Sequence, residues 1–469
     1  VQGLLQGALP LSKRGGAMAS AASPLLDIDE DKSLAPPCPA QGGIDPWLWC
    51  LVIPIFFGML ASVRLTIPSS PYFDEVHYLP AARELLKIGD PGGAELLNPE
   101  HPMLGKQLIA LGIHWLGDTP LGWRIPPLIA GTFALSAGMR ALWHTSRDRY
   151  ATIAFGVLLA TGFQLFVHTR LAMLDIFMVA FLALAAWHFA AAIREPETGR
   201  WRLALTGAAL GLAMASKWNA VPLAMVPGLT FFAARLSAGR RRLIFSRRGV
   251  PVPGISLAEA FLWLGIVPLC VYALTFAPGY WMGTELRPSG LASEGLIGFH
   301  QQILDLQSQV LMPHAYQSTW PQWVTNTRGI WYLYEFIDNA QRGVLLIGNP
   351  LTMLLGLPAL VWCLISGLYR MDWPRIAVVV GYGVALGFWL IAPKPVQFYY
   401  HYTIPSVFLL AALALALGDF RAREKLRWIS LAVPIGSAAM FALFFPILTA
   451  APLEGPMSFA KWAWLSGWR

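Results

Sequence analysis

Long apolar segments recur along most of the chain, and short polar stretches separate them. Most are about 17 to 25 residues long, the length that a helix needs to cross the hydrocarbon core of a bilayer. By this criterion we count about eleven. They lie near 47–68, 120–143, 150–167, 171–193, 203–216, 219–235, 257–278, 343–368, 376–393, 399–418 and 428–449. The pattern predicts an all-α polytopic membrane protein.

The composition agrees with this prediction. Of the 469 residues, 56% are hydrophobic and only 13% are charged, and the mean hydropathy is +0.53. An ordinary soluble domain does not have this balance.

The net charge of +8 does not indicate a nucleic-acid partner, because the basic residues collect in alternate loops. Cytoplasmic loops of membrane proteins carry such an excess of Lys and Arg. Five loops hold 17 of the 34 Lys and Arg residues: 144–149, 194–202, 235–248, 370–375 and 421–427. The distribution predicts a cytoplasmic N-terminus, an external C-terminus, and two larger outer loops at 69–119 and 279–342.

The first 45 residues are rich in Pro, Ala, Gly and Ser and show no periodicity. We expect residues 1–45 to be a disordered cytoplasmic tail, with Met18 as an alternative start, and 46–469 to be one transmembrane domain. The first apolar segment is then an uncleaved signal anchor. The cysteines lie too far apart to indicate a disulfide framework and are interpreted as packing residues: Cys38, Cys50, Cys270 and Cys363.

The two outer loops differ in character. Loop 69–119 contains the amphipathic segment "HYLPAARELLKIG", which predicts a helix on the membrane surface that ends at Gly89. Loop 279–342 is rich in Trp, Tyr, Gln and His, as at a membrane interface, and shows no strand periodicity.

Ionisable residues gather at the outer ends of the apolar segments. Charges at membrane depth are costly, so they indicate function. The predicted topology places all of them near the same leaflet: Asp74, Glu75, His101, Lys106, Arg124, Arg170, Asp175, Lys217 and His401.

Transfer of a sugar from a polyprenyl phosphate requires such a set of residues. The lipid tail of the donor stays in the bilayer, and Lys or Arg side chains stabilise the charge on the leaving phosphate. The acceptor hydroxyl is a poor nucleophile and needs a carboxylate as general base. One carboxylate suffices for an inverting displacement, and its neighbour can orient the acceptor.

Each residue also has a simpler interpretation. Asp74 and Glu75 could be solvated loop acids, or an N-cap of the surface helix. Lys106 and Arg124 could extend their charges to the interface from helix ends. His101 and His401 could be ordinary hydrogen-bonded histidines.

Asp175 is harder to explain in this way. It lies about one turn inside an apolar helix, where a charge needs a partner, and Arg170 and Arg124 are the candidates. Lys217 interrupts an apolar stretch, which favours a functional role.

Several motifs together resemble one family, the dolichyl-phosphate-mannose–protein mannosyltransferases, over about residues 47 to 450. They are "PYFDEVHYLPAARELL", "EHPMLGKQLIALG", "RLAMLDIFMV", "GLAMASKWNAVPL", "HAYQSTWPQW", "GNPLTMLLGLPAL" and "FYYHYTIPSVF". The resemblance implies a type C glycosyltransferase fold with eleven transmembrane helices and an active site on the periplasmic or lumenal side. It implies transfer of mannose from a polyprenyl phosphate to Ser or Thr hydroxyls of secreted polypeptides.

The resemblance also implies roles for single residues. Asp74 matches the position of the family's base, with Glu75 beside it at the acceptor. Lys217 matches a donor-phosphate ligand and Arg124 an essential arginine. The remaining matches imply donor binding or site architecture, with Lys106, Arg170 and His401 assigned to the donor and His101 and Asp175 to the architecture.

The chain departs from the family's eukaryotic members. The second outer loop is too short for their β-trefoil insertion, so the chain resembles a bacterial member located in the inner membrane. The segment "PHAYQS" leaves a role for His314 open. The donor would be an undecaprenyl-type phosphate sugar, and the sugar need not be mannose.

The expected partners are this donor, a secreted polypeptide and membrane lipids, with the Sec translocon as a further candidate. No cofactor and no metal ligands are indicated, and a metal requirement stays open.

Two other functions are compatible with part of the pattern. A transferase of the aminoarabinose type, which modifies lipid A or a cell-envelope glycan, would share the early acid, the lysine after it and Asp175. A transporter or flippase for a lipid-linked sugar is disfavoured, because no inverted repeat and no chain of ionisable groups leads to the cytoplasmic side.

Overall fold

The computed structural model describes residues 43–90, 94–238, 243–280, 291–309, 312–392 and 394–469. Most of the predicted tail, including Met18 and Cys38, lies outside them. Helices make up most of the described chain: α1 Trp49–Ser62, α2 Glu75–Leu86, α3 Leu104–Leu116, α4 Pro120–Ser146, α5 Arg149–Ala160, α6 Phe163–Thr169, α7 Leu174–Arg194, α8 Gly199–Ser216, α9 Val221–Ser237, α10 Leu257–Phe261, α11 Val267–Leu274, α12 Leu291–Ser308, α13 Trp320–Val324, α14 Pro350–Arg370, α15 Trp373–Ile391, α16 Thr403–Arg421 and α17 Arg427–Leu448.

Short turns connect several of these helices. The single-turn helix η2 (Trp218–Ala220) separates α8 from α9, and η6 (Tyr399–Tyr402) precedes α16. A π-helical turn at Leu262–Ile266 joins α10 to α11. Two strands, β1 Ile330–Ile337 and β2 Ala340–Leu346, form an antiparallel hairpin.

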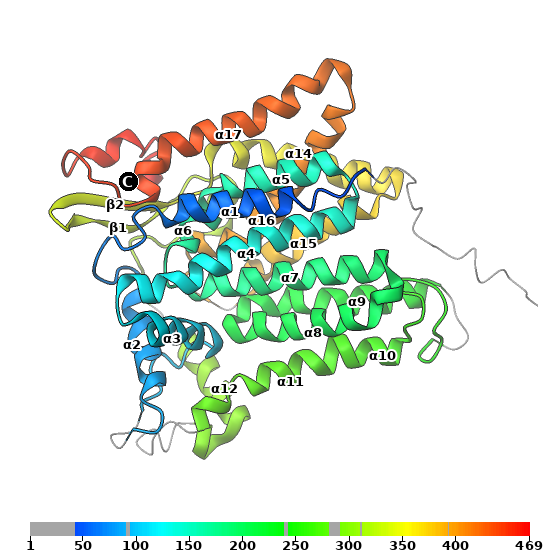
Figure 1. Cartoon of the computed structure of the whole chain (residues 1–469), viewed down its shortest axis with the longest axis horizontal. Coiled ribbons are helices and arrows are strands. Elements are labelled where there is room, and N and C mark those ends of the chain that lie inside the picture. Colours follow the sequence, from blue (N-terminus) through cyan, green and yellow to red (C-terminus); the bar gives the residue numbers. More distant parts are fainter. Residues whose placement is uncertain (1–42, 91–93, 239–242, 281–290, 310–311, 393) are drawn as a thin grey trace, which may run out of the picture.

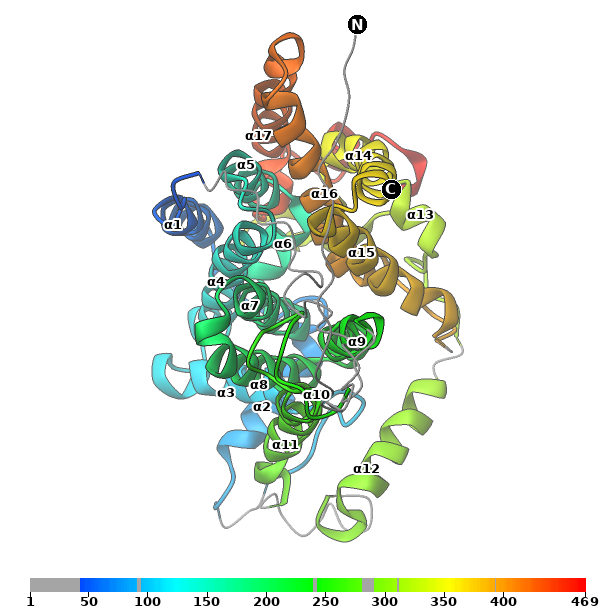
Figure 2. The same ribbon diagram turned by 90° about the vertical axis from the view of Figure 1, so that its right-hand side faces the viewer.

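The long helices run side by side as a bundle (Figure 1). Seen along their axes in Figure 2, α16 lies inside the bundle, and it contacts α5, α14, α15 and α17. Its sequence "LLAALALALG" is apolar on every side, which is typical of a helix without a solvent-facing stripe. This accounts for the burial of α16 along most of its length.

Every predicted apolar segment coincides with one or more helices, but the number of spans is not confirmed. Among the described residues, eight helices are long and apolar enough to cross a membrane, or nine if the bent pair α5–α6 is one span. Helix α1 is shorter, with 14 residues. The segment predicted at 343–368 begins as a helix only at Pro350, because β2 occupies its first residues.

The basic loops meet at one end of the bundle. Arg147 and Arg202 both bind Glu195, at 3.3 and 2.5 Å, which ties the loop after α4 to the loop after α7. Arg375 binds Asp419 at 2.6 Å and so connects α15 to α16. In Figure 1 this end lies opposite α2, α3 and the hairpin.

At the other end, the surface helix and the second loop differ from expectation. Helix α2 already begins at Glu75 and ends at Leu86, while Gly89 has a positive φ of 94° three residues later. The prediction that 279–342 lacks strands is wrong, since β1 and the first three residues of β2 lie there. Asp338 and Asn339 have φ values of 48° and 58°, as a tight hairpin turn requires.

The cysteines are only partly the packing residues we expected. Cys50 and Cys363 are buried, whereas Cys270 on α11 is exposed. All three are free thiols.

Candidate functional site

Two buried arginines hold the segment that leads from α1 to α2. Arg170, just after α6, donates to the backbone carbonyls of Val63 at 2.6 Å and Arg64 at 3.2 Å, and also to Ala61. These carbonyls lie at or just after the last turn of α1, where backbone C=O groups lack partners within the helix. Arg170 therefore supports the segment that carries the Asp-Glu pair.

Arg124 on α4 makes the second set of contacts. Its guanidinium donates to the carbonyls of Leu65 at 3.1 Å, Pro68 at 2.7 Å and Ser70 at 3.2 Å. It also forms a two-pronged ion pair with Glu75, at 2.9 and 2.7 Å. The side chains of both partners have 0% exposure, so Arg124 does not extend its charge to the interface.

Both carboxylate oxygens of Glu75 are occupied. Besides Arg124, Glu75 accepts hydrogen bonds from the backbone N–H groups of Ala172 at 3.0 Å and Tyr72 at 3.3 Å. The ion pair thus connects α2, α4 and the segment before α7. A carboxylate with this many donors is held in one position.

Asp74 is placed differently, although it is the next residue. It is half-buried, and Tyr78 donates to its Oδ2 at 3.3 Å. It occupies the N-cap position of α2, but its side chain makes no capping hydrogen bond. The simpler interpretation of Asp74 as a helix cap is therefore wrong.

The backbone before Asp74 is strained. Phe73 has a φ of 52°, a conformation that bulky residues rarely adopt and that is concentrated at functional sites. Its ring stacks on Tyr332 of β1, with ring centroids 3.8 Å apart. The hairpin thus packs against Phe73, whose backbone conformation sets the direction of the next residue, Asp74.

Several charged groups surround the Asp74 carboxyl. Burial raises its pKa above the usual value, and Asp175 acts in the same direction. The charges of Lys217 and His77 and the hydrogen bond from Tyr78 lower the pKa. Asp74 therefore binds its proton more strongly than a solvated aspartate does.

Lys217 and Asp175 form a buried ion pair with an Nζ–Oδ2 distance of 2.7 Å. Lys217 follows the last turn of α8, and Asp175 lies in the first turn of α7. The prediction that Asp175 pairs with Arg170 or Arg124 is wrong, because both arginines are bound to the segment after α1. The ammonium of Lys217 also lies 5.0 Å from the ring centroid of Tyr400.

Lys106 and His101 lie together at the start of α3. Lys106 is buried and donates to the carbonyls of Asn98 at 2.6 Å and His101 at 3.0 Å. Burial lowers its pKa to about 7. These contacts hold the turn that places the His101 ring 6.0 Å from the ring of Tyr78. They also show that the simpler interpretation of Lys106, in which its ammonium extends to the membrane interface, is wrong.

His401 in η6 is packed between tryptophans. Its ring stacks on Trp389 at 3.7 Å and meets Trp323 edge-on at 5.8 Å. The backbone N–H of Phe398 donates to its Nδ1 at 3.1 Å, whereas its Nε2 is buried without a partner among the described residues. His314, whose role was open, has an exposed side chain and accepts from Tyr316 N at 3.1 Å.

Sequence reasoning missed three residues of this region. Tyr78 could have been found, because it lies four positions after Asp74 on the same helix face. Tyr332, whose hydroxyl contacts His168 Nε2 at 3.1 Å, and Lys394, between α15 and η6, carry no local signal.

The arrangement can remove a proton and stabilise a developing anion. It offers one half-buried carboxylate, Asp74, which no cation of the described chain contacts directly and which lies next to a buried ion pair and aromatic rings. Among the described residues, no group of three or more His, Cys, Asp or Glu side chains could hold a metal ion.

Comparisons with known proteins agree with this chemistry. Residues 49–283 match the sequence profile of a family described as dolichyl-phosphate-mannose-protein mannosyltransferase. Residues 293–468 match the C-terminal four-transmembrane region of protein-O-mannosyltransferase. The two matches cover nearly the whole predicted transmembrane domain.

Curated relatives carry a related name. A polyprenol-phosphate-mannose–protein mannosyltransferase of Mycolicibacterium smegmatis is 27% identical over 92% of this chain and 93% of its own length. The protein of the same name from Mycobacterium tuberculosis is 27% identical over 86% of this chain and 88% of its own.

Solved structures show the same fold. The protein O-mannosyltransferase complex of S. cerevisiae bound to the sugar donor matches 90% of this chain and 92% of its own, with a TM-score of 0.75 and 15% identity. ArnT from Cupriavidus metallidurans in the apo state matches 86% of this chain and 76% of its own, with a TM-score of 0.56 and 14% identity. The predicted type C glycosyltransferase fold is confirmed.

Proposed function

Because the chain belongs to the dolichyl-phosphate-mannose–protein mannosyltransferase family, we propose that it transfers mannose from a polyprenyl phosphate to Ser and Thr hydroxyls of secreted polypeptides. The relatives whose names specify this donor and this type of acceptor match it along most of their length. The observation that carries the proposal is the placement of Asp74, half-buried after a strained Phe73 and near the Lys217–Asp175 pair.

In the proposed reaction, Asp74 is the general base. Its carboxylate accepts the proton of the acceptor hydroxyl as the oxygen forms a bond to the anomeric carbon of mannose. The bond from that carbon to the phosphate oxygen breaks, and the electron pair leaves with the polyprenyl phosphate. The leaving group is already an anion of low basicity and needs no acid.

Glu75 has a different role in this proposal. Its oxygens are committed to Arg124 and to two backbone N–H groups, so it positions the segment that carries Asp74. Arg170 and Lys106 likewise bind backbone carbonyls. Direct donor contacts of Lys106, Arg124 and Arg170 stay predictions.

We place the reaction at the periplasmic face of a bacterial inner membrane. The basic loops lie at the opposite end of the bundle from α2, which Asp74 directly precedes, and such loops are cytoplasmic in most membrane proteins. Surrounding lipids would hold the polyprenyl tail. An acceptor that is still unfolded would be met as it leaves the Sec translocon.

The test is the substitution Asp74→Asn, which keeps the shape of the side chain and removes the base. Transfer of radiolabelled mannose from polyprenyl-phosphate mannose to a Ser/Thr peptide should fall by about 10²- to 10⁴-fold. Asp90→Asn is the matched control, because Asp90 is an exposed acid in the same outer loop. Full activity of the Asp74→Asn enzyme would refute the base assignment.

A deletion strain tests the substrate class. Loss of hexose from Ser and Thr of periplasmic proteins, measured by mass spectrometry, would support protein mannosylation. Unchanged glycoproteins together with altered lipid A would instead support the aminoarabinose-type alternative.

A further inference from the structure

The cations that the sequence places at the outer end are engaged by protein groups. Arg124 is bound to Glu75 and three carbonyls, and Arg170 to carbonyls after α1. Lys106 donates to two carbonyls, and Lys217 is neutralised by Asp175 at 2.7 Å. A ligand with a phosphate group would have to compete with these contacts.

Lys394 is different. It lies in the short segment between α15 and η6, and its ammonium forms no hydrogen bond or ion pair within the part of the chain that the structure describes. The charges of Lys217, Asp175 and Asp74 all act on the Lys394 ammonium, so Lys394 belongs to the same group of charges as the proposed base. Burial lowers its pKa to about 8, so the group is still mostly charged at pH 7.

His401, seven residues later, offers a hydrogen-bond donor without an acceptor. Its Nδ1 accepts the N–H of Phe398, and a ring nitrogen that accepts a hydrogen bond carries no proton. The neutral ring therefore carries its proton on Nε2, which is buried without a partner among the described residues. A buried donor without an acceptor is costly unless a ligand or water supplies one.

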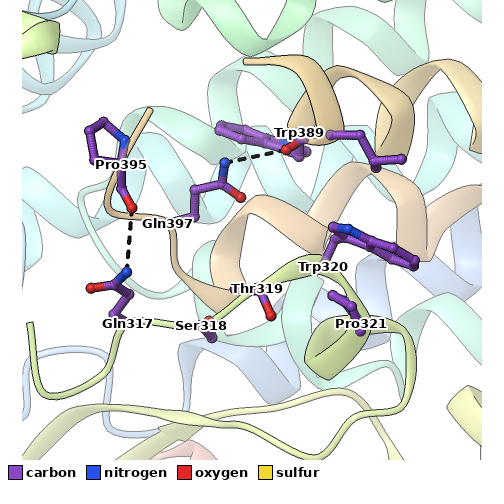
Figure 3. Close-up of a pocket in the computed structure, with 9 residues that line it drawn as sticks. Gln317, Ser318, Thr319, Trp320, Pro321, Trp389, Pro395 and Gln397 are labelled. Atoms are coloured by element: carbon purple, nitrogen blue, oxygen red, sulfur yellow. Dashed lines mark hydrogen bonds between the residues drawn. The ribbon is translucent and has the colours of Figure 1, made fainter. Parts of the chain in front are cut away.

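The segment that carries both groups is held in place. Gln317 donates to the carbonyl of Pro395 at 3.3 Å, and Gln397 donates to that of Trp389 at 3.3 Å (Figure 3). The backbone N–H of Ser318 donates to the carbonyl of Gln397 at 2.9 Å. These residues line a pocket of about 550 Å³. Trp389 is one of the lining residues, and its ring also stacks on His401.

Building on the proposed function, we propose that Lys394 and His401 bind the phosphate of the lipid-linked donor, and that Lys217 positions Asp175 instead of contacting this phosphate. The ammonium supplies an unneutralised positive charge, and His401 Nε2–H donates to a phosphate oxygen. Both interactions strengthen as the bond to mannose breaks and negative charge develops on the leaving group.

Binding of the product tests this site without requiring transfer. Radiolabelled undecaprenyl phosphate is bound to the purified full-length protein in detergent, with undecaprenol, which lacks the phosphate, as the comparison ligand. Lys394→Met should weaken binding of undecaprenyl phosphate by about 10-fold or more and leave undecaprenol binding unchanged. Lys394→Arg should restore part of the affinity, because it retains the charge.

His401→Phe keeps a ring between the two tryptophans and removes the donor, and it should weaken phosphate binding several-fold. Lys87→Met is the control, because Lys87 is an exposed lysine of the first outer loop that pairs with Glu84. It should bind undecaprenyl phosphate like the unaltered protein. Thermal unfolding of each variant verifies that it is folded.

The outcomes separate the two proposals. If Lys394→Met binds undecaprenyl phosphate as tightly as the unaltered protein does, or if the unaltered protein does not bind it, the phosphate site is wrong. If Lys394→Met loses phosphate binding but the unaltered protein transfers no mannose to peptides, the phosphate site stands and the proposed acceptor class fails.

Discussion

Adjacent residues of the same chemical type have opposite environments here. Glu75 has 0% side-chain exposure and lies between an arginine and two N–H groups, whereas Asp74 is half-buried and, among the described residues, has only Tyr78 as a donor. Since a general base must be free to accept a proton, only Asp74 is suited to that role. The difference arises because successive residues at a helix start point in different directions.

The raised pKa of Asp74 predicts the pH dependence of transfer. A base acts in its deprotonated form, so kcat/KM should rise as pH increases through a pKa above the ordinary aspartate value of 3.8. The charged and titratable groups that act on Asp74, or on which it acts, include Lys217, Asp175, His77, Tyr78, Tyr332, Lys394 and Tyr400. A pH–rate profile of peptide mannosylation measures the inflection, which should be missing from the residual activity of Asp74→Asn.

The Lys217–Asp175 pair predicts a strong coupling between two substitutions. Asp175→Asn leaves a buried ammonium without its partner and should lower the free energy of unfolding by about 3–5 kcal/mol. Adding Lys217→Met should restore much of this loss, because no unpaired charge remains. Unfolding of the two single variants and the double variant in detergent gives the coupling energy, and additive losses would contradict a direct pair.

Helix pairs pack closely where small residues face each other. Gly207 and Gly211 on α8 are one turn apart, in the sequence "GAALG". A Cβ at Gly207 would lie 1.9 Å from the carbonyl oxygen of Trp263, and one at Gly211 2.5 Å from that of Pro268. The two glycines thus allow α8 to approach the helix formed by α10 and α11, as small residues do in many membrane proteins.

This contact predicts that Gly207→Ala destabilises the protein. Backbone atoms would have to move, at a cost of about 1–3 kcal/mol, which thermal unfolding in detergent can measure. Gly383→Ala on α15 is the matched control, because nothing lies within 4 Å of a Cβ there. That variant should keep or raise stability, since alanine has the higher helix propensity. Equal effects of both substitutions would refute the packing argument.

On the scale of the whole molecule, the two ends of the bundle have different chemistry. One end carries the basic loops, held together by Glu195 and Asp419. The other carries α2, α3, the hairpin and the candidate site (Figure 1). An enzyme that uses a lipid-linked donor needs its reacting groups at one interface only, and this asymmetry meets that need.

The orientation of these ends predicts which side a reagent can reach. A cysteine introduced at Asn339, exposed at the hairpin tip, should react with a membrane-impermeant thiol reagent in intact spheroplasts. One at Lys425, exposed in the basic loop before α17, should react only after permeabilisation. Both would be made in a variant without native cysteines. The reverse pattern would contradict a periplasmic active site.

Some of the structure could be predicted because its signals are local in the chain. Apolar length located the helices, and alternating basic loops indicated that Asp74, Lys106, Arg124 and Lys217 share one end. For Lys106 and Arg124 the sequence left open whether the charge is buried or extends to the interface. Apolar length also could not show that α1 is short or that α5 and α6 bend by 60°.

The hairpin was missed for a physical reason. Strand β2 reads "AQRGVLL", and four of its residues belong to an apolar stretch that periodicity cannot assign to helix or strand. This stretch forms a strand because its backbone pairs with that of β1. The sequence of one segment does not show with which other segment its backbone will pair, so the hairpin could not be predicted from it.

The sequence by itself determined the class of protein, the approximate positions of its helices, their orientation and the family motifs, because hydropathy, charge and spacing act along the chain. Only the tertiary structure decided which charges meet. It paired Lys217 with Asp175, committed Glu75 to Arg124, and brought Lys394 from some 300 residues away to face Asp74. These pairings depend on which helices are neighbours, and that depends on packing of the whole bundle.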